Sequence, residues 1–224
     1  KLCEKLILYE PKLVIMVDCG STSLSAIDYL NKNNIKSLVI DHHEINKPYP
    51  KANAIINPKK NNGYLEYEYL CAATLTYFFL ELLSKKIQCK IDLTKYLFNV
   101  LLATVCKEKN IKKFNRLISI IVLKEFDIND NYIFKRFYEL INKKNKINVN
   151  DLGYLIGPML NAGGRLGKSN CATELLSTDN SNLINKKSLE LFNLNEKRKN
   201  IENTIWNNID FRQLEKDNDD VIIY

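Results

Sequence analysis

Two short apolar runs, each followed directly by an acidic residue, constrain the fold of this chain most. Residues 13–17 (Leu-Val-Ile-Met-Val) precede Asp18, and residues 37–40 (Ser-Leu-Val-Ile) precede Asp41-His42-His43. Short apolar runs of this kind are typical of buried parallel strands. The segment between them carries apolar residues at helical spacing. Residues 13–41 therefore predict one β-α-β unit with a right-handed crossover.

Both predicted strands end in side chains that bind metals. The carboxyl ends of parallel strands face the crevice in which open α/β sheets bind ligands. Carboxylate and imidazole groups suit divalent metals such as manganese. The two histidines of the chain, His42 and His43, both lie here. Taken alone they could be surface histidines in a loop, but Asp18 at the end of the other strand favours a shared site, with Asp18 expected within about 8 Å of His42.

Composition narrows the class of protein. A hydrophobic content of 46% is ample for a packed core and argues against disorder. The six cysteines are scattered without a C-x-x-C pair, which suits a reducing cytosol. No apolar run approaches the ~18 residues that a membrane span needs, so we expect a cytoplasmic location without a membrane partner. The net charge of +7 is compatible with a polyanionic partner, although lysine-rich faces are often merely solvated.

The rest of the chain is mainly helical in pattern. A third strand is predicted near residues 53–57, and helices near 69–85, 93–106, 117–122 and 132–141. A glycine-rich loop at 157–167 is expected to interrupt this helical region, and a long helix follows. The predicted fold class is therefore α/β: a mainly parallel sheet flanked by helices, followed by a helical region and a long connector helix.

Several segments, taken in order, match one known pattern. They are Val17-Asp18-Cys19-Gly20, Asp41-His42-His43, Ala54-Ile55-Ile56-Asn57-Pro58, Leu70-Cys71-Ala72-Ala73, the run Gly157 to Gly167, and residues 194–202. Together they resemble the DHH phosphoesterase superfamily, and specifically its RecJ group of single-stranded-DNA exonucleases. The DHH triplet followed at this separation by Asn161-Ala162-Gly163-Gly164-Arg165 is the most specific part. The extension Gly167-Lys168-Ser169 gives the resemblance an alphaproteobacterial character.

The resemblance implies a function and a domain plan. It implies 5′-to-3′ hydrolysis of single-stranded DNA at a two-metal site holding Mn²⁺ or Mg²⁺, in DNA repair and recombination. Single-stranded DNA is the implied partner, with a single-strand-binding protein or a helicase as candidate partners. Residues 1–180 would form the DHH core without its N-terminal motif, 181–215 the connector helix, and 216–224 the start of a DHHA1-type domain. The first residue, Lys1, and the strand-like last residues lead us to expect an internal piece of a longer protein.

The resemblance also assigns roles to residues. Asp18 and His42 would bind metal, with Asp18 bridging two ions. Asp41 would hold the His42 ring in the correct tautomer, and His43 would be a ligand or contact the substrate phosphate; Asp41 and His43 are the predicted catalytic residues. The nucleic-acid-binding residues would be Asn161, Gly163, Gly164 and Arg165, the two glycines leaving backbone amides free for an anion.

Three departures from the family pattern bear on activity. The Asp-x-Asp motif that precedes the Asp18 strand in the family would lie upstream of Lys1. Lys107 stands where the family has a metal-binding aspartate, which replaces an anion by a cation. A shift of alignment by one residue would instead make Glu108 the ligand. Met159 stands where the family usually has arginine, removing one phosphate contact.

Two alternatives remain open from the sequence. The first is a non-catalytic RecJ-like protein, a decayed homologue or a DNA-binding scaffold, which Lys107 favours. The second is a DHH enzyme acting on a small substrate, such as a pyrophosphatase or a phosphodiesterase of short oligonucleotides. The motif at Asn161 to Arg165 and the connector helix argue against the second. If the alignment is right, the Lys107 ammonium should pair with Asp18 or Asp41.

Overall fold

The computed structural model describes residues 2–60 and 64–209. The chain divides into two compact units, residues 1–125 and residues 126–224, called here the first and the second unit. Each is described by itself. Among the described helices of either unit, none is long and apolar enough to cross a membrane.

The first unit is built on a parallel three-stranded sheet. Its strands are β1 (Leu13–Val17), β2 (Lys36–Ile40) and β3 (Ala54–Ile56), in the order β1-β2-β3. Val17 pairs with Ile40, and Ile40 pairs with Ile56. The carboxyl ends of all three strands therefore lie at one edge of the sheet, as the two apolar runs predicted. The α/β fold class and the three predicted strands are confirmed.

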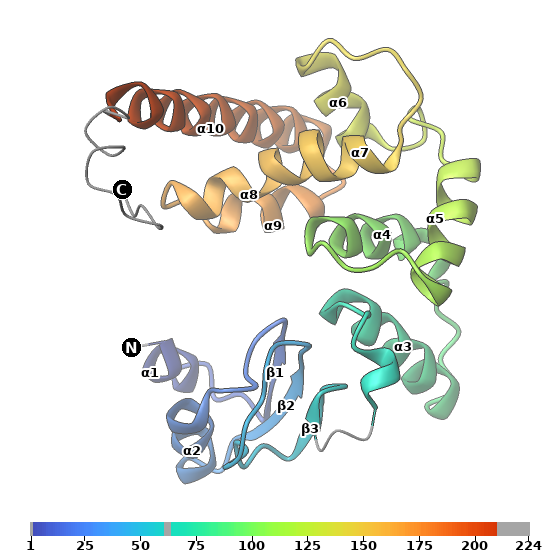
Figure 1. Ribbon diagram of the computed structural model, residues 1–224. Coiled ribbons are helices and arrows are strands. Elements are labelled where there is room, and N and C mark those ends of the chain that lie inside the picture. Colours follow the sequence, from blue (N-terminus) through green and yellow to red (C-terminus); the bar gives the residue numbers. More distant parts are fainter. Residues whose placement is uncertain (1, 61–63, 210–224) are drawn as a thin grey trace, which may run out of the picture. The chain divides into compact units, whose positions relative to one another are not determined.

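Five helices accompany these strands in the described part of the first unit. They are α1 (Leu2–Ile7), α2 (Leu24–Lys32), α3 (Ala72–Lys86), α4 (Leu97–Cys106) and α5 (Lys113–Glu125). Helices α1 and α2 lie on one side of the strands and α3 on the other (Figure 1). Short 3-10 turns, η2 (Leu65–Tyr67) and η3 (Thr94–Tyr96), precede α3 and α4.

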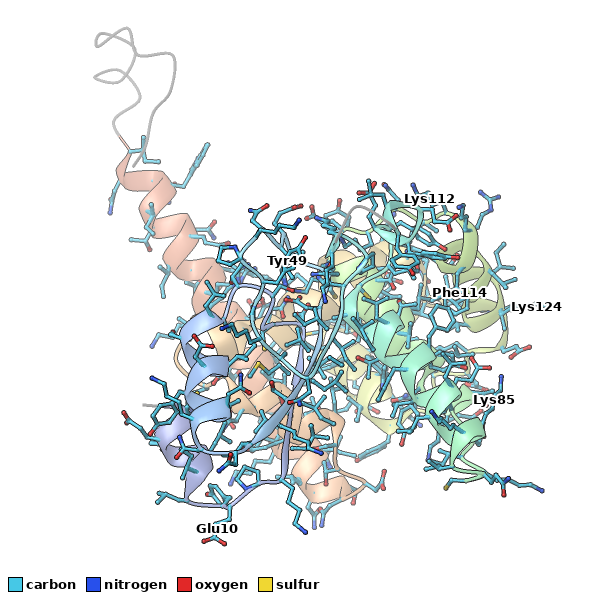
Figure 2. The ribbon with its side chains drawn as sticks, turned by 90° about the horizontal axis from the view of Figure 1, so that it is seen from below. Glu10, Tyr49, Lys85, Lys112, Phe114 and Lys124 are labelled. Atoms are coloured by element: carbon cyan, nitrogen blue, oxygen red, sulfur yellow. The ribbon has the colours of Figure 1, made fainter. Side chains whose placement is uncertain are left out.

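The core of the first unit joins the sheet to α3. Leu38 and Ile40 of β2 pack with Leu70, which precedes α3, and with Leu75 in its first turn. Further along, Phe78 of α3 meets Phe114 of α5, which is labelled in Figure 2, with ring centroids 4.7 Å apart. Burial of a side chain of this size contributes about 1.5–3 kcal/mol, so this cluster fixes α3 against the sheet.

The second unit is helical. Its described elements are α6 (Tyr132–Leu140), α7 (Val149–Asp151), a π-helical turn η4 (Leu152–Ile156), α8 (Gly157–Arg165), α9 (Asn170–Leu176) and α10 (Ser181–Asn208). The long helix α10 packs against α6, α8 and α9, and buries Ile184 and Leu191 between them. Further along α10, Ile201 and Ile205 are exposed, so its apolar face is covered only over its first half.

The predicted connector helix at 181–215 is a helix from Ser181 to Asn208, and residues 210–215 lie outside the described residues. The predicted DHHA1-type segment at 216–224 lies outside them as well. The division between domains that the sequence predicts after residue 180 stays a prediction. The boundary between the two compact units lies elsewhere, between residues 125 and 126.

The glycine-rich loop predicted at 157–167 is wrong, because residues 157–165 form helix α8. Pro158 lies in the first turn, where proline is well tolerated. The helix ends at Arg165 and is followed by Gly167, whose φ is +78°, and the Lys168 N–H donates to the Gly163 carbonyl at 2.7 Å. This is the glycine-terminated helix end described as a Schellman motif. The sequence therefore carried a start and a stop signal for a helix.

Candidate metal centre

Asp18 is held by the backbone at the end of β1. Its N–H donates to the Ile40 carbonyl at 3.0 Å, which continues the pairing of β1 with β2 by one residue. Its φ of +61° lies in the left-handed region, which non-glycine residues rarely adopt and which often marks functional sites. The chain then turns through Gly20, where a Cβ would lie 3.0 Å from Met16 Sδ. The Asp18 side chain is thereby presented at the carboxyl-end edge of the sheet.

Asp41, directly after β2, organises the turn that carries the histidines. Its Oδ2 accepts the Ser21 N–H at 3.1 Å, and its Oδ1 accepts the His42 N–H at 2.8 Å. Oδ1 also lies 2.6 Å from His43 Nδ1. Burial opposes ionisation of this carboxyl, but the hydrogen bonds from Ser21, His43 and His42 outweigh it and lower the pKa of Asp41 to about 2. Asp41 is therefore an anion at neutral pH.

The expectation that Asp41 orients the His42 ring is wrong. Its carboxylate contacts the His42 backbone and the His43 ring instead. An ionised Asp41 can only accept, so Nδ1 of His43 is the donor in this pair and Nε2 faces away from it. Asp41 thus fixes the half-exposed His43 ring by the carboxylate–histidine arrangement that often supports metal ligands.

Asp18, His42 and His43 form the metal-type cluster of the described residues. One ligand atom from each lies within 4.8 Å of the others. His42 Nε2 is 3.2 Å from Asp18 Oδ1, yet the two are not oriented as a hydrogen bond. Both atoms, and His42 Nδ1, are buried and lack a hydrogen-bond partner among the described residues. Two ligands of one ion at about 2 Å lie about 3 Å apart, so these atoms fit a divalent metal.

The electrostatics of His42 favour a ligand form. Burial, followed by the positive charge of Lys109, lowers the pKa of His42, and the opposing attraction of Asp18 is a smaller effect. A neutral imidazole, which is the form that binds metals, is therefore present at neutral pH. Burial also lowers the pKa of Lys109, with help from the nearby Lys59. The positive charges of Lys109 and Lys107 both act on His42 and help to keep it neutral.

Lys107 reaches the cluster from the end of α4. Its Nζ lies 2.8 Å from Asp18 Oδ2, and both side chains are 39% exposed. The prediction that Lys107 pairs with Asp18 is confirmed. Glu108 is exposed and does not belong to the metal-type cluster in the described part of the chain. The structure therefore puts a cation, and not a replacement carboxylate, beside Asp18.

Two residues beside these strand ends, Ser21 and Asn57, were not predicted to belong to the site. Asn57, which follows β3, donates from Nδ2 to Ser21 Oγ at 2.8 Å and to the His43 carbonyl at 2.9 Å. Asn57 therefore ties the third strand end to the other two. Its position directly after an apolar run, at the edge where Asp18 and Asp41 were placed, was the signal that could have revealed it.

The four predicted nucleic-acid-binding residues lie in the second unit, on α8. Asn161 and Arg165 are four residues apart and both exposed, so they share one face of the helix, with Gly164 beside them. Gly163 is buried instead: a Cβ there would lie 2.5 Å from the Lys168 carbonyl oxygen. In a helix the amides of Gly163 and Gly164 donate to carbonyls one turn back, so the expectation of free amides is wrong. Contact of these residues with DNA stays a prediction.

Comparison with known proteins agrees with this site. The profile of the DHH family, N-terminal domain, matches residues 2–105, which include β1, β2 and the three metal-type residues. Residues 2–105 are thus similar to a DHH domain. Similarity to RecJ extends beyond them: single-stranded-DNA-specific exonuclease RecJ of Haemophilus influenzae is 26% identical over 201 residues, and that of Escherichia coli is 27% identical over 203 residues. Each alignment covers 85% of this chain and 35% of the relative, so the chain spans about a third of the length of these curated relatives.

Solved structures show the same fold. RecJ from Thermus thermophilus in complex with Mn²⁺ matches with a TM-score of 0.77 and 23% identity, over 90% of this chain and 30% of that protein. A second structure, exonuclease RecJ bound to manganese, also has a TM-score of 0.77 and 23% identity, over 90% of this chain and 51% of that protein. The chain thus shares its fold with these two proteins, each of which was solved with manganese.

Proposed function

We propose that this chain supplies the metal-binding and hydrolytic centre of a 5′-to-3′ single-stranded-DNA exonuclease that acts in DNA repair and recombination. The observation that carries the proposal is the cluster of Asp18, His42 and His43 at adjacent strand ends, with buried ligand atoms that have no hydrogen-bond partner among the described residues. The RecJ relatives, which are named for single-stranded-DNA-specific exonuclease activity, support the choice of substrate.

Each residue of the centre then has a role in binding the metal ion or the phosphate. Asp18 Oδ1 and His42 Nε2 would hold a Mn²⁺ or Mg²⁺ ion, and the neutral state of His42 keeps its lone pair available. Such an ion would supply an activated water and a positive charge for the phosphate oxygens. Asp41 holds the exposed His43 ring through Nδ1, which leaves Nε2 available to a metal ion or a substrate phosphate. Lys109 adds positive charge on the side of His42, where it can attract a phosphodiester.

Asn161 and Arg165 would hold the backbone of the DNA strand. Both are exposed on one face of α8, and a planar guanidinium binds phosphate oxygens in pairs. The net charge of +7 adds a sequence-independent attraction to DNA. A single-strand-binding protein or a helicase that delivers the strand belongs to the same proposal.

A non-catalytic DNA-binding protein is the second candidate, and one observation favours it. The Lys107 ammonium lies 2.8 Å from Asp18 Oδ2, so a cation already neutralises the carboxylate that the metal requires. In this form the centre would bind DNA phosphates through its lysines without cleaving them.

One set of assays separates the two candidates. The purified chain is incubated with Mn²⁺ and single-stranded DNA labelled at either end, and binding is measured on the same DNA by anisotropy. Mn²⁺-dependent shortening from the 5′ end that is lost in Asp18→Ala and His42→Ala, but kept in the surface control Lys85→Ala, supports the exonuclease. Salt-dependent binding without shortening, with Mn²⁺-dependent shortening gained in Lys107→Asp, supports the non-catalytic candidate. Absence of both binding and shortening contradicts both.

A further inference from the structure

The two oxygens of Asp18 have different partners. Oδ1 faces His42 Nε2 at 3.2 Å, inside the metal-type cluster. Oδ2 faces the Lys107 ammonium at 2.8 Å. A carboxylate that bridges two metal ions offers one oxygen to each, and paired ions of this kind lie about 3.5–4 Å apart. In this chain a second ion bound to Oδ2 would have to share that oxygen with the Lys107 ammonium.

We infer that the Lys107 ammonium replaces a second metal ion at this centre, so that the centre takes a single divalent ion. The inference rests on the proposed metal-binding function of Asp18, His42 and His43. The ion is held through Asp18 Oδ1, His42 Nε2 and His43, while Oδ2 stays paired with Lys107.

Repulsion decides against a second ion. An ion bound to Oδ2 at about 2 Å would lie about 4 Å from the ammonium that contacts the same oxygen. Even with the full screening of water, repulsion between charges of +2 and +1 at about 4 Å weakens binding about thirtyfold. The Coulomb energy therefore favours one metal ion together with the fixed ammonium.

The backbone position of Lys107 keeps its ammonium at the place of the second metal ion. Lys107 directly follows α4, and its N–H donates to the Ala103 carbonyl at 3.0 Å, so its backbone belongs to the end of that helix. Thr104 and Leu101 of the same helix are buried, which fixes the helix in the unit. A side chain that starts from a fixed helix end and reaches Asp18 supplies a charge that chelators cannot remove.

The test is the number of Mn²⁺ ions bound and their magnetic coupling, measured on the metal-free chain by calorimetric titration and electron paramagnetic resonance. We expect one Mn²⁺ per wild-type chain, with the spectrum of an isolated ion. Lys107→Met, which removes the charge without adding a ligand, should keep one ion and bind it at least about tenfold more tightly. Lys107→Asp, which offers a carboxylate beside Asp18 Oδ2, should bind a second ion and show a coupled spectrum.

Lys85→Met is the matched control, because Lys85 forms a surface ion pair with Glu81 within α3 and should leave Mn²⁺ binding unchanged. Two coupled ions in the wild-type chain, or one ion whose affinity is the same in all Lys107 variants, would overturn the inference and leave the proposed metal centre intact. Absence of Mn²⁺ binding in the wild type and in both Lys107 variants would overturn the proposed centre as well. Circular dichroism of each variant establishes that it is folded.

Discussion

Gly163 and Gly164 are neighbours on α8 with opposite surroundings, and they give a sharp test of the packing of the second unit. A Cβ on Gly163 would lie 2.5 Å from the Lys168 carbonyl oxygen, whereas a Cβ on Gly164 would meet nothing within 4 Å. We predict that Gly163→Ala destabilises the chain and that Gly164→Ala stabilises it.

The magnitude follows from the contact. Relief of the Gly163 contact requires a shift of nearly 1 Å, because ordinary contacts of a Cβ begin at about 3.4 Å. The Lys168 backbone resists such a shift, since its N–H donates to the Gly163 carbonyl at 2.7 Å and its carbonyl accepts the Cys171 N–H at 3.2 Å. Overpacking of this kind costs about 1–3 kcal/mol. The gain of about 1 kcal/mol from replacing a helical glycine is common to both variants and cancels between them. Gly164→Ala should therefore exceed Gly163→Ala in unfolding free energy by about 1–3 kcal/mol.

The assay is urea unfolding of the whole chain, followed by far-ultraviolet circular dichroism, with both variants and the wild type in one series. Equal midpoints for the two variants, or a more stable Gly163→Ala, would refute the packing of Gly163 against Lys168. The same proteins test the role in DNA binding. If the DNA backbone approaches α8 closely at Gly164, Gly164→Ala should weaken single-strand binding although it raises stability.

Three further predictions concern DNA binding, acid stability and the metal. Arg165→Ala should weaken binding of single-stranded DNA and reduce the slope of log K against log salt by about 0.7, and an unchanged slope would count against a phosphate contact. The pKa of Asp41 in the folded state, about 2, lies below the unfolded value near 3.9, so its stabilisation of about 2 kcal/mol is complete above about pH 4 and disappears as the pH falls through 2. Asp41→Asn should lower the urea midpoint at pH 7 and flatten its fall between pH 4 and 2; an acid profile like that of the wild type would contradict this. Mn²⁺ should raise the melting temperature of the wild type, EDTA should reverse the rise, and Asp18→Ala should show none; a rise of equal size in that variant would place the ion elsewhere.

The sheet and the shared position of Asp18 and His42 could be predicted because they follow from short stretches of sequence, each read by itself. Each apolar run is short, and a helix between two parallel strands forces both carboxyl ends to one edge. An acidic residue directly after a strand is then placed to within a few ångströms, as the 3.2 Å between Asp18 and His42 shows. The pairing of Lys107 followed from its aligned position, because the end of α4 reaches the same edge.

The partners of Asp41 could not be predicted in this way. Which ring its carboxylate contacts depends on the side-chain torsions of a three-residue turn, and neither periodicity nor motif matching encodes them. Helix α8 was missed for another reason. Its glycines were assigned to close approach of a ligand, whereas Gly163 is required for close approach of the chain to itself at Lys168, where the helix ends.

The π-helical turn η4 sets the rotational register of everything that follows it in α8. Helix α7, η4 and α8 run without a break from Val149 to Arg165, and the wider turn of a π-helix holds one residue more than an α-helical turn. Conversion of this turn into a regular α-helical turn, without loss of a residue, would rotate the downstream side chains by about 100°. Leu160 would then take the outward direction that Asn161 has now. The direction in which this helix presents its polar side chains therefore depends on the type of turn in an apolar segment that need not touch any ligand.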